Sequence, residues 1–112
     1  MSDIGRWTTP VARKLHTCEN CGRKIDQGEK YHSYDGIYDG IANAWKDCRH
    51  CAALISMFDL YGIYDEGVGP DEVGEWEPET VAGLRAKVYW RKRWRRPDGT
   101  LYPVPQREDV TQ

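Results

Sequence analysis

Four cysteines stand in two pairs of equal internal spacing, and thiolates at such a spacing bind soft metal ions. Cys18 and Cys21 form the first CxxC pair, and Cys48 and Cys51 form the second. A zinc ion takes four such ligands in a tetrahedron, which closes its coordination sphere against substrate. The spacing therefore predicts one structural Zn²⁺ bound by all four cysteines. Unligated cysteines, two disulfides or an iron–sulfur cluster are the alternatives.

The three histidines are candidates for a ligand or an acid–base group. A complete set of four cysteines makes a histidine ligand unnecessary, and we expect His50 to lie in a first helical turn and point away from the metal. We expect His16 and His32 to be surface or packing residues. A histidine acid–base site would also need a positioned partner, so we predict no catalytic residue.

A second group of residues suits the binding of an anionic partner. The candidates are the consecutive residues Tyr89, Trp90, Arg91, Lys92, Arg93, Trp94, Arg95 and Arg96. Basic side chains neutralise phosphates, and the interleaved rings can stack on bases. In the alternative, the tryptophan side packs inward and the basic side is only solvated.

The net charge of -2 conceals a segregation of charge along the chain. Residues 59–79 carry acids and no base, whereas residues 85–96 carry bases and no acid. Such blocks mark partner surfaces or solvated faces, or they pair with each other. The acidic stretch could imitate nucleic acid toward a basic protein groove, or be a solvated loop.

Length and composition indicate a small non-membrane protein. With 112 residues, one domain is expected, and a core of this size is marginal without help from a metal. The apolar runs are far shorter than a membrane span, and the first residues lack the layout of a secretory signal. We therefore expect a cytoplasmic protein, where cysteines bind metals more often than they form disulfides.

Several elements should position the cysteines. Cys18–Gly22 predicts a zinc knuckle, and residues 30–47 predict a β-hairpin with Asp35-Gly36 and Asp39-Gly40 as turns. The second CxxC should open a helix capped by Asp47 and stopped by Gly62. Its metal-binding and apolar face would hold Cys48, Cys51, Leu54, Ile55 and Phe58, with Tyr61 as a further candidate.

The remaining residues divide the chain into further parts. We expect an arm over residues 1–16, a zinc domain over 17–62, an acidic Gly/Pro linker over 63–78, an extension over 79–104 and a tail over 105–112. Within the extension we prefer a helix over about 78–88 followed by a β-hairpin through the turn Pro97-Asp98-Gly99. One continuous helix to Arg96 is the alternative.

The order of knuckle, hairpin and helix, with a CxxC at each end, resembles the treble-clef zinc finger over about residues 15–62. The run from Cys18 to Tyr31 is similar to the opening of many such modules. The run from Gly36 to Leu54 resembles small four-cysteine zinc proteins often encoded by tailed phages. The resemblance implies a small zinc-stabilised α+β fold and a phage setting, with the host cytoplasm as the location, and it implies no specific activity.

Treble-clef folds also include HNH-type nucleases, so a degenerate nuclease is one alternative. Such enzymes usually carry an Asp-His or similar pair on the hairpin, an asparagine after it, and a histidine just past the last cysteine. Here Tyr31-His32-Ser33 lies on the hairpin, Asn43 is isolated, and Cys51 is followed by Ala52-Ala53. The general base and the metal ligand for phosphodiester cleavage are not visible together.

We therefore expect a non-enzymatic, zinc-binding regulatory protein that binds a host protein complex as an inhibitor or modulator. The acidic stretch 59–79 and the tryptophans and tyrosines, on a small rigid scaffold, would bind such a partner, and the basic segment could take part as a second surface. A DNA- or RNA-binding protein that uses residues 89–96 is the main alternative.

Overall fold

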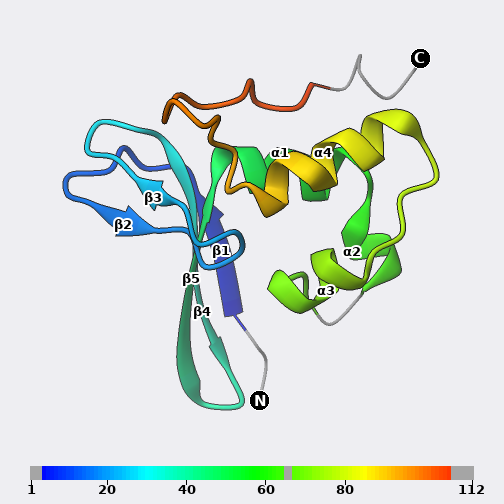
Figure 1. The fold of residues 1–112 in the computed structure, drawn as a ribbon. Helices are drawn as coiled ribbons and strands as arrows, with labels where there is room; N and C mark the ends of the chain where they lie inside the picture. The colour runs from blue at the N-terminus through cyan, green and yellow to red at the C-terminus, as the bar shows by residue number, and fades with distance from the viewer. Residues whose placement is uncertain (1–3, 65–66, 107–112) are drawn as a thin grey trace. The chain divides into compact units, whose positions relative to one another are not determined.

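The computed structural model describes residues 4–64 and 67–106, which form two compact units, Met1–Arg49 and His50–Gln112 (Figure 1). The first unit is built from five strands: β1 (Ile4–Thr8), β2 (His16–Thr17), β3 (Lys24–Ile25), β4 (Tyr31–Tyr38) and β5 (Ile41–Cys48). Four helices follow: α1 (Arg49–Met57), α2 (Leu60–Ile63), α3 (Pro70–Glu75) and α4 (Val81–Arg91). Within the described residues, no helix has the length and apolar content needed to cross a membrane.

The predicted hairpin is confirmed as the antiparallel pair β4 and β5. Its turn is Asp39-Gly40, and both residues have positive φ (52° and 77°), as a two-residue hairpin turn requires. Asp35-Gly36, which was also expected to turn, instead lies inside β4, where Gly36 is opposite Asn43. A single tight turn lets both strands extend to eight residues, so a second turn has no place.

The N-terminal residues form a strand where an arm was predicted. β1 pairs antiparallel with the free edge of β4 and gives the sheet order β1-β4-β5. Trp7 stands opposite Tyr34, and their rings stack with centroids 5.3 Å apart. The cross-strand aromatic pair stabilises a register that the polar sequence of this segment did not reveal.

The knuckle is a small second sheet. β2 and β3 pair antiparallel around Cys18–Gly22, and Gly22 has a φ of 81° in the turn. The buried side chains of this unit include Ala12, Cys18, Ile25, Tyr31 and Cys48. Arg23 and Asp47 are buried among them, so the core of the first unit is partly polar.

The predicted helix of the second CxxC is confirmed, but both of its predicted ends are wrong. Asp47 belongs to β5, its carboxylate accepts a hydrogen bond from the Trp45 indole, and the helix begins at Arg49. The helix ends at Met57, five residues before Gly62. Asp59 then takes a left-handed conformation (φ 51°), and Gly62 lies inside the short helix α2.

Part of the predicted acidic linker is a helix. α3 begins with Pro70, and Glu72 accepts a hydrogen bond from the amide of Gly69, which caps the helix. The carbonyls of Gly74 and Trp76 at its other end both accept hydrogen bonds from the buried Lys87 ammonium. The helix forms where an acid, Glu72, caps it and the apolar residues Val73 and Trp76 are buried.

The preferred β-hairpin after residue 88 is wrong. α4 is capped by Thr80, whose hydroxyl accepts from the amide of Gly83, and the helix continues to Arg91. It does not extend to Arg96, because Arg93 and Trp94 both have positive φ (56° and 60°). Arg95 and Leu101 form only an isolated bridge. Pro103 and Pro105 lack the amide hydrogens that a longer returning strand would need.

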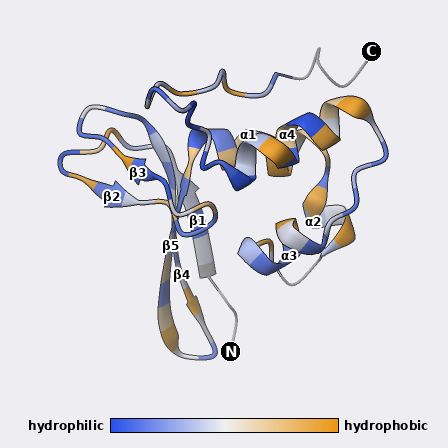
Figure 2. Ribbon diagram, in the orientation of Figure 1, coloured by the Kyte–Doolittle hydropathy of each residue, from blue (hydrophilic) through white to orange (hydrophobic). Residues whose placement is uncertain are grey.

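The helical unit encloses its own apolar core. Hydrophobic and hydrophilic residues alternate along α4 (Figure 2), but its large apolar residues Val81, Leu84 and Val88 are exposed, and the buried side chains of this helix are those of Ala86 and Lys87. The buried side chains among the described residues of this unit, His50–Gln112, include His50, Cys51, Leu54, Ile55, Leu60, Val68, Val73, Trp76, Ala86, Lys87 and Trp94. Cys48 ends β5 and Cys51 lies in α1, whereas Cys18 and Cys21 lie in the turn between β2 and β3.

Candidate metal centre

The four cysteines form one cluster with metal-binding geometry. Their sulfur atoms all lie within 4.8 Å of one another, and those of Cys21 and Cys48 are 3.8 Å apart. A tetrahedral zinc ion with Zn–S bonds of about 2.3 Å requires sulfur–sulfur distances of about 3.8 Å. All four cysteines are free thiols, which excludes the two-disulfide alternative. The cluster thus fits one metal ion and is consistent with zinc.

Backbone amides surround two of the sulfur atoms. The Cys18 sulfur accepts from the amides of Asn20, Cys21 and Cys48 at 3.3–3.4 Å. The Cys21 sulfur accepts from the amide of Arg23 at 3.4 Å. Donors at these positions stabilise thiolates rather than thiols, and four thiolates around Zn²⁺ leave a net charge of about -2 to be compensated.

Residues 19 and 46 join the knuckle to β5 next to the ligands. The Glu19 amide donates to the carbonyl of Lys46 at 2.8 Å. The Lys46 amide in turn donates to the Glu19 carboxylate at 2.6 Å. This reciprocal pair holds the first CxxC against the strand that ends in Cys48.

Arg23 places a buried positive charge beside the centre. Its side chain is fully buried and forms a salt bridge with Glu29. It also hydrogen-bonds Cys48. Burial alone would lower the pKa of the guanidinium, but the Glu29 bond and the Cys48 charge outweigh it and hold that pKa above its ordinary value. Sequence reasoning missed this residue, since no local pattern distinguishes a buried arginine from an exposed one.

The carboxyl of Asp47 adjoins the same ligand. Burial raises the pKa of this carboxyl to about 7. The hydrogen bond from Trp45 acts in the opposite direction and lowers the pKa, whereas the negative charge of Cys48 raises it further. A raised pKa favours the protonated, uncharged form of the carboxyl, and this form adds no negative charge next to the thiolates.

Trp94 supplies a donor to the fourth ligand. Its indole nitrogen donates to the Cys51 sulfur at 3.4 Å, and its ring is fully buried. The ring also packs on His50 at a centroid distance of 5.3 Å. Trp94 was predicted as a partner-binding residue, and the structure places it inside the core. No local signal could have shown this, because 43 residues separate it from Cys51.

The histidines lie outside the cluster, as expected. His50 is buried, and its Nε2 lies 2.7 Å from the Tyr102 carbonyl oxygen. His16 packs on the ring of Tyr31. His32 is half-buried on β4, and burial lowers its pKa. In the described part of the chain, the cysteines alone make up this cluster.

The predicted binding residues 89–96 divide between the surface and the core. Arg91, Lys92, Arg93 and Arg96 are exposed, and Trp90 and Arg95 are half-buried. Tyr89 stacks on Tyr102 with ring centroids 3.9 Å apart. The guanidinium carbon of Arg96 lies 4.9 Å from the centroid of the Tyr102 ring. The basic groups therefore face solvent, while two of the predicted stacking rings, Tyr89 and Trp94, contact other side chains.

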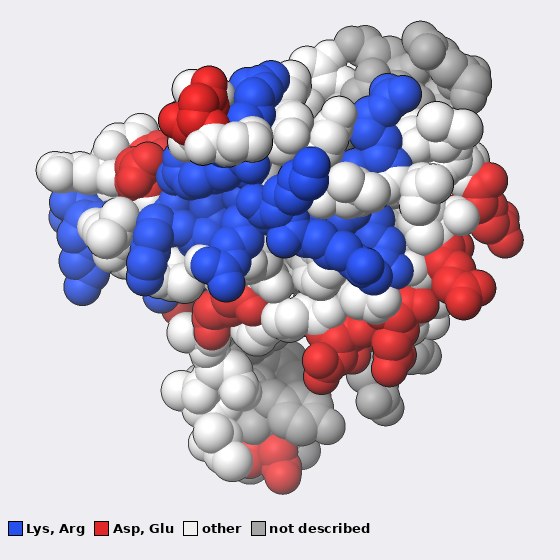
Figure 3. All heavy atoms as spheres, in the orientation of Figure 1, with Lys and Arg blue, Asp and Glu red and all other residues white. Residues whose placement is uncertain are grey.

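Acidic and basic side chains occupy different elements of the helical unit. Figure 3 shows Lys and Arg gathered over α4, and Asp and Glu over α3. The exposed acids of α3 include Asp71 and Glu75. Val68, Val73 and Trp76 of the same stretch are buried, so it cannot be removed as a solvated loop.

Comparison of the chain with protein-family models, curated proteins and solved structures found no match.

Proposed function

We propose that this chain is a non-enzymatic treble-clef zinc protein that regulates a host protein complex by binding it, in a phage-infected cell. The order of the knuckle β2–β3, the hairpin β4–β5 and the helix α1, with one CxxC at each end, supports the treble-clef assignment. A closed four-cysteine site stabilises the fold and offers no open position for chemistry.

The exposed basic surface of the helical unit carries the binding proposal. We define this basic surface as Arg85, Arg91, Lys92, Arg93 and Arg96, which are all exposed. Residues 80–97 contain no acid, and the following Asp98 interacts electrostatically with Arg96. Unbalanced cations on a packed helix and turn attract an acidic partner and set its orientation.

A protein partner fits this surface better than a single-stranded nucleic acid. Single strands need free aromatic platforms, and Trp94 is buried while Tyr89 is covered on one side by Tyr102. The same unit also exposes Asp71 and Glu75, which repel phosphates but can pair with a protein of mixed charge.

DNA binding is the second candidate, favoured by the basic surface alone. Duplex DNA requires phosphate contacts and no stacking, and the exposed arginines could supply them. A nuclease is not proposed. His32 is opposite Asp47 and Asn43 is opposite Gly36, so His32 and Asn43 lie about 13 Å apart along the hairpin.

Fluorescence anisotropy with the zinc-loaded protein separates these functions. The probes are a labelled Glu-rich peptide, a labelled DNA duplex and a labelled single-stranded RNA, each titrated with salt. Replacing Arg91, Lys92 and Arg93 together by Gln removes three charges of the basic surface. A matched control replaces the exposed Arg6, Arg13 and Lys14 of the first unit by Gln.

Peptide binding that the first triple variant loses and the control retains supports the proposal. If the protein binds the DNA duplex with a steep salt dependence and does not bind the peptide, DNA binding is the function and the protein-binding proposal is wrong. Equal losses in both triple variants would show that net charge, and not this surface, drives association.

A further inference from the structure

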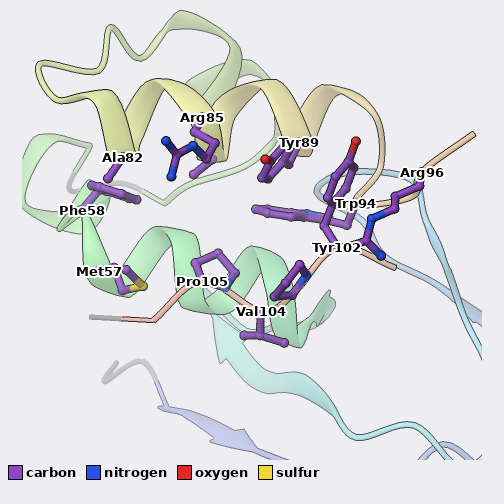
Figure 4. A pocket seen from close by; sticks show the side chains of 12 residues that line it. Met57, Phe58, Ala82, Arg85, Tyr89, Trp94, Arg96, Tyr102, Val104 and Pro105 are labelled. Carbon is purple, nitrogen blue, oxygen red and sulfur yellow. The ribbon is translucent and has the colours of Figure 1, made fainter. Parts of the chain in front are cut away.

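A cavity of about 490 Å³ opens in the helical unit beside the basic surface. One side is the α4 face formed by Ala82, Arg85, Ala86 and Tyr89, which recur at helical spacing. Met57 and Phe58 at the end of α1 form a second side, and the segment 102–105 forms a third (Figure 4). Its volume is within the range of ligand pockets, about 300–1,000 Å³.

Small side chains on α4 create the space. Ala82 and Ala86 occupy positions where larger residues would fill the cavity, and Phe58, Trp94 and Val104 give it apolar walls. Figure 4 shows these walls facing one another around the opening. A cavity of this size holds one large apolar side chain together with adjoining backbone.

The charged groups of the lining are all positive. Arg85 and Arg96 line the cavity, and its lining contains no carboxylate. Arg96 is oriented by hydrogen bonds to Thr100 and the Leu101 carbonyl. Arg85 forms no salt bridge with any residue in the ranges 4–64 and 67–106. The cavity therefore complements an occupant that combines an apolar body with negative charge.

We propose that this cavity binds an acidic peptide segment of the partner protein, with one Phe or Leu side chain inserted between α1 and α4. Carboxylates on either side of the inserted residue pair with Arg85 and Arg96. The inference rests on the proposed function and adds the site and the chemistry of its ligand. Arginine–carboxylate pairs form strong charge-assisted hydrogen bonds, and a few buried anchor residues carry most of the binding free energy of an interface.

Three labelled peptides test the site by anisotropy with the zinc-loaded full chain. The first is acetyl-Glu-Glu-Phe-Leu-Glu-Glu, the second replaces Phe-Leu by Gly-Ser, and the third replaces every Glu by Lys. We expect the first to bind roughly tenfold to a hundredfold more tightly than the second, because burial of one large apolar side chain contributes that factor. The third should not bind.

Matched variants on α4 localise the peptide. Ala82→Phe fills the cavity, whereas Val81→Phe adds the same ring at an adjacent position that is 73% exposed and outside the lining. Arg85→Gln removes a charge from the lining, and Arg13→Gln removes one exposed charge from the first unit, outside the basic surface. Loss of at least tenfold affinity in Ala82→Phe and Arg85→Gln, with near-normal binding in both controls, is the expected result.

Two other outcomes overturn the proposal in different ways. Equal affinities for the Phe-Leu and Gly-Ser peptides would contradict the insertion of an apolar side chain into the cavity. The proposed function would still stand, because the protein would still bind acidic peptides at its surface. Binding of no acidic peptide by the folded wild-type protein would remove both. Circular dichroism of each variant verifies folding, and Arg85→Gln tests the cavity if Ala82→Phe does not fold.

Discussion

The indole nitrogen of Trp94 donates a hydrogen bond to the sulfur of Cys51 at 3.4 Å, and this joins the turn after α4 to a ligand of the metal centre. The turn takes two consecutive residues, Arg93 and Trp94, into the left-handed region, which side-chain-bearing residues rarely adopt. Strain of this kind persists where the surrounding contacts determine it. Here the contacts are the Cys51 sulfur and the ring of His50.

Trp94→Phe should weaken zinc binding by about tenfold while it keeps most of the ring packing. The variant removes the donor to Cys51, and loss of such a partner commonly costs tenfold to a hundredfold in metal affinity. Competition with a chromophoric chelator measures the change. Trp7→Phe on β1 is the control, since Trp7 contacts Tyr34. Unchanged affinity in Trp94→Phe would contradict a role for the hydrogen bond.

Removal of the metal should unfold the protein. Structural zinc contributes folding free energy directly, and neither unit has a large apolar core to replace it. We expect a strong chelator to abolish cooperative thermal unfolding, and Cys48→Ser to behave like the chelated protein. Circular dichroism and metal analysis check this, with zinc-saturated chelator as the control. A metal-free Cys48→Ser protein that unfolds cooperatively would contradict the structural role.

Glu29→Gln should destabilise the first unit by about 3–5 kcal/mol, because it leaves the buried guanidinium of Arg23 without its counter-charge. Chemical denaturation of the zinc-loaded protein measures the free energy of unfolding. Asp35→Asn, which alters an exposed acid of the same unit, is the matched comparison. A loss below 1 kcal/mol would show that the pair contributes little.

The difference between wild type and Glu29→Gln should depend on pH with a definite sign. Burial alone would raise the pKa of Glu29, but the bond to Arg23 lowers it below its ordinary value of 4.5. The stabilisation is therefore fully present above pH 4.5 and is lost as the pH falls through the lower pKa of the folded state. Denaturation at several pH values should show the two proteins converging on the acid side. A constant difference would contradict this linkage.

Lys87→Met should destabilise the helical unit by about 1–3 kcal/mol. The ammonium donates to the carbonyls of Gly74 and Trp76 at the end of α3, and these acceptors would lose a buried partner. The apolar stem is kept, so packing changes little. Thermal unfolding checks the prediction, with Lys92→Met at an exposed position as the control. Equal midpoints for the two variants would contradict it.

The sequence by itself determined the metal ligands, the hairpin and the helix after it. These follow from local patterns, because CxxC spacing sets where thiolates point, Asp39-Gly40 suits positive φ, and apolar residues at helical spacing mark a buried face. The sequence also located the block of bases, since charge composition can be counted without a fold.

Only the tertiary structure decided which side chains of that block are available. Arg93 and Trp94 are neighbours in the same basic and aromatic segment. Trp94 is buried against Cys51, whereas Arg93 faces solvent. The same applies to Arg23, whose charge is stabilised by Glu29 and Cys48. It also applies to β1, whose residues pair with residues of β4 that lie 25 to 33 positions further along the chain. Burial, hydrogen bonding and strand pairing between distant residues are properties of packing, which local sequence patterns do not encode.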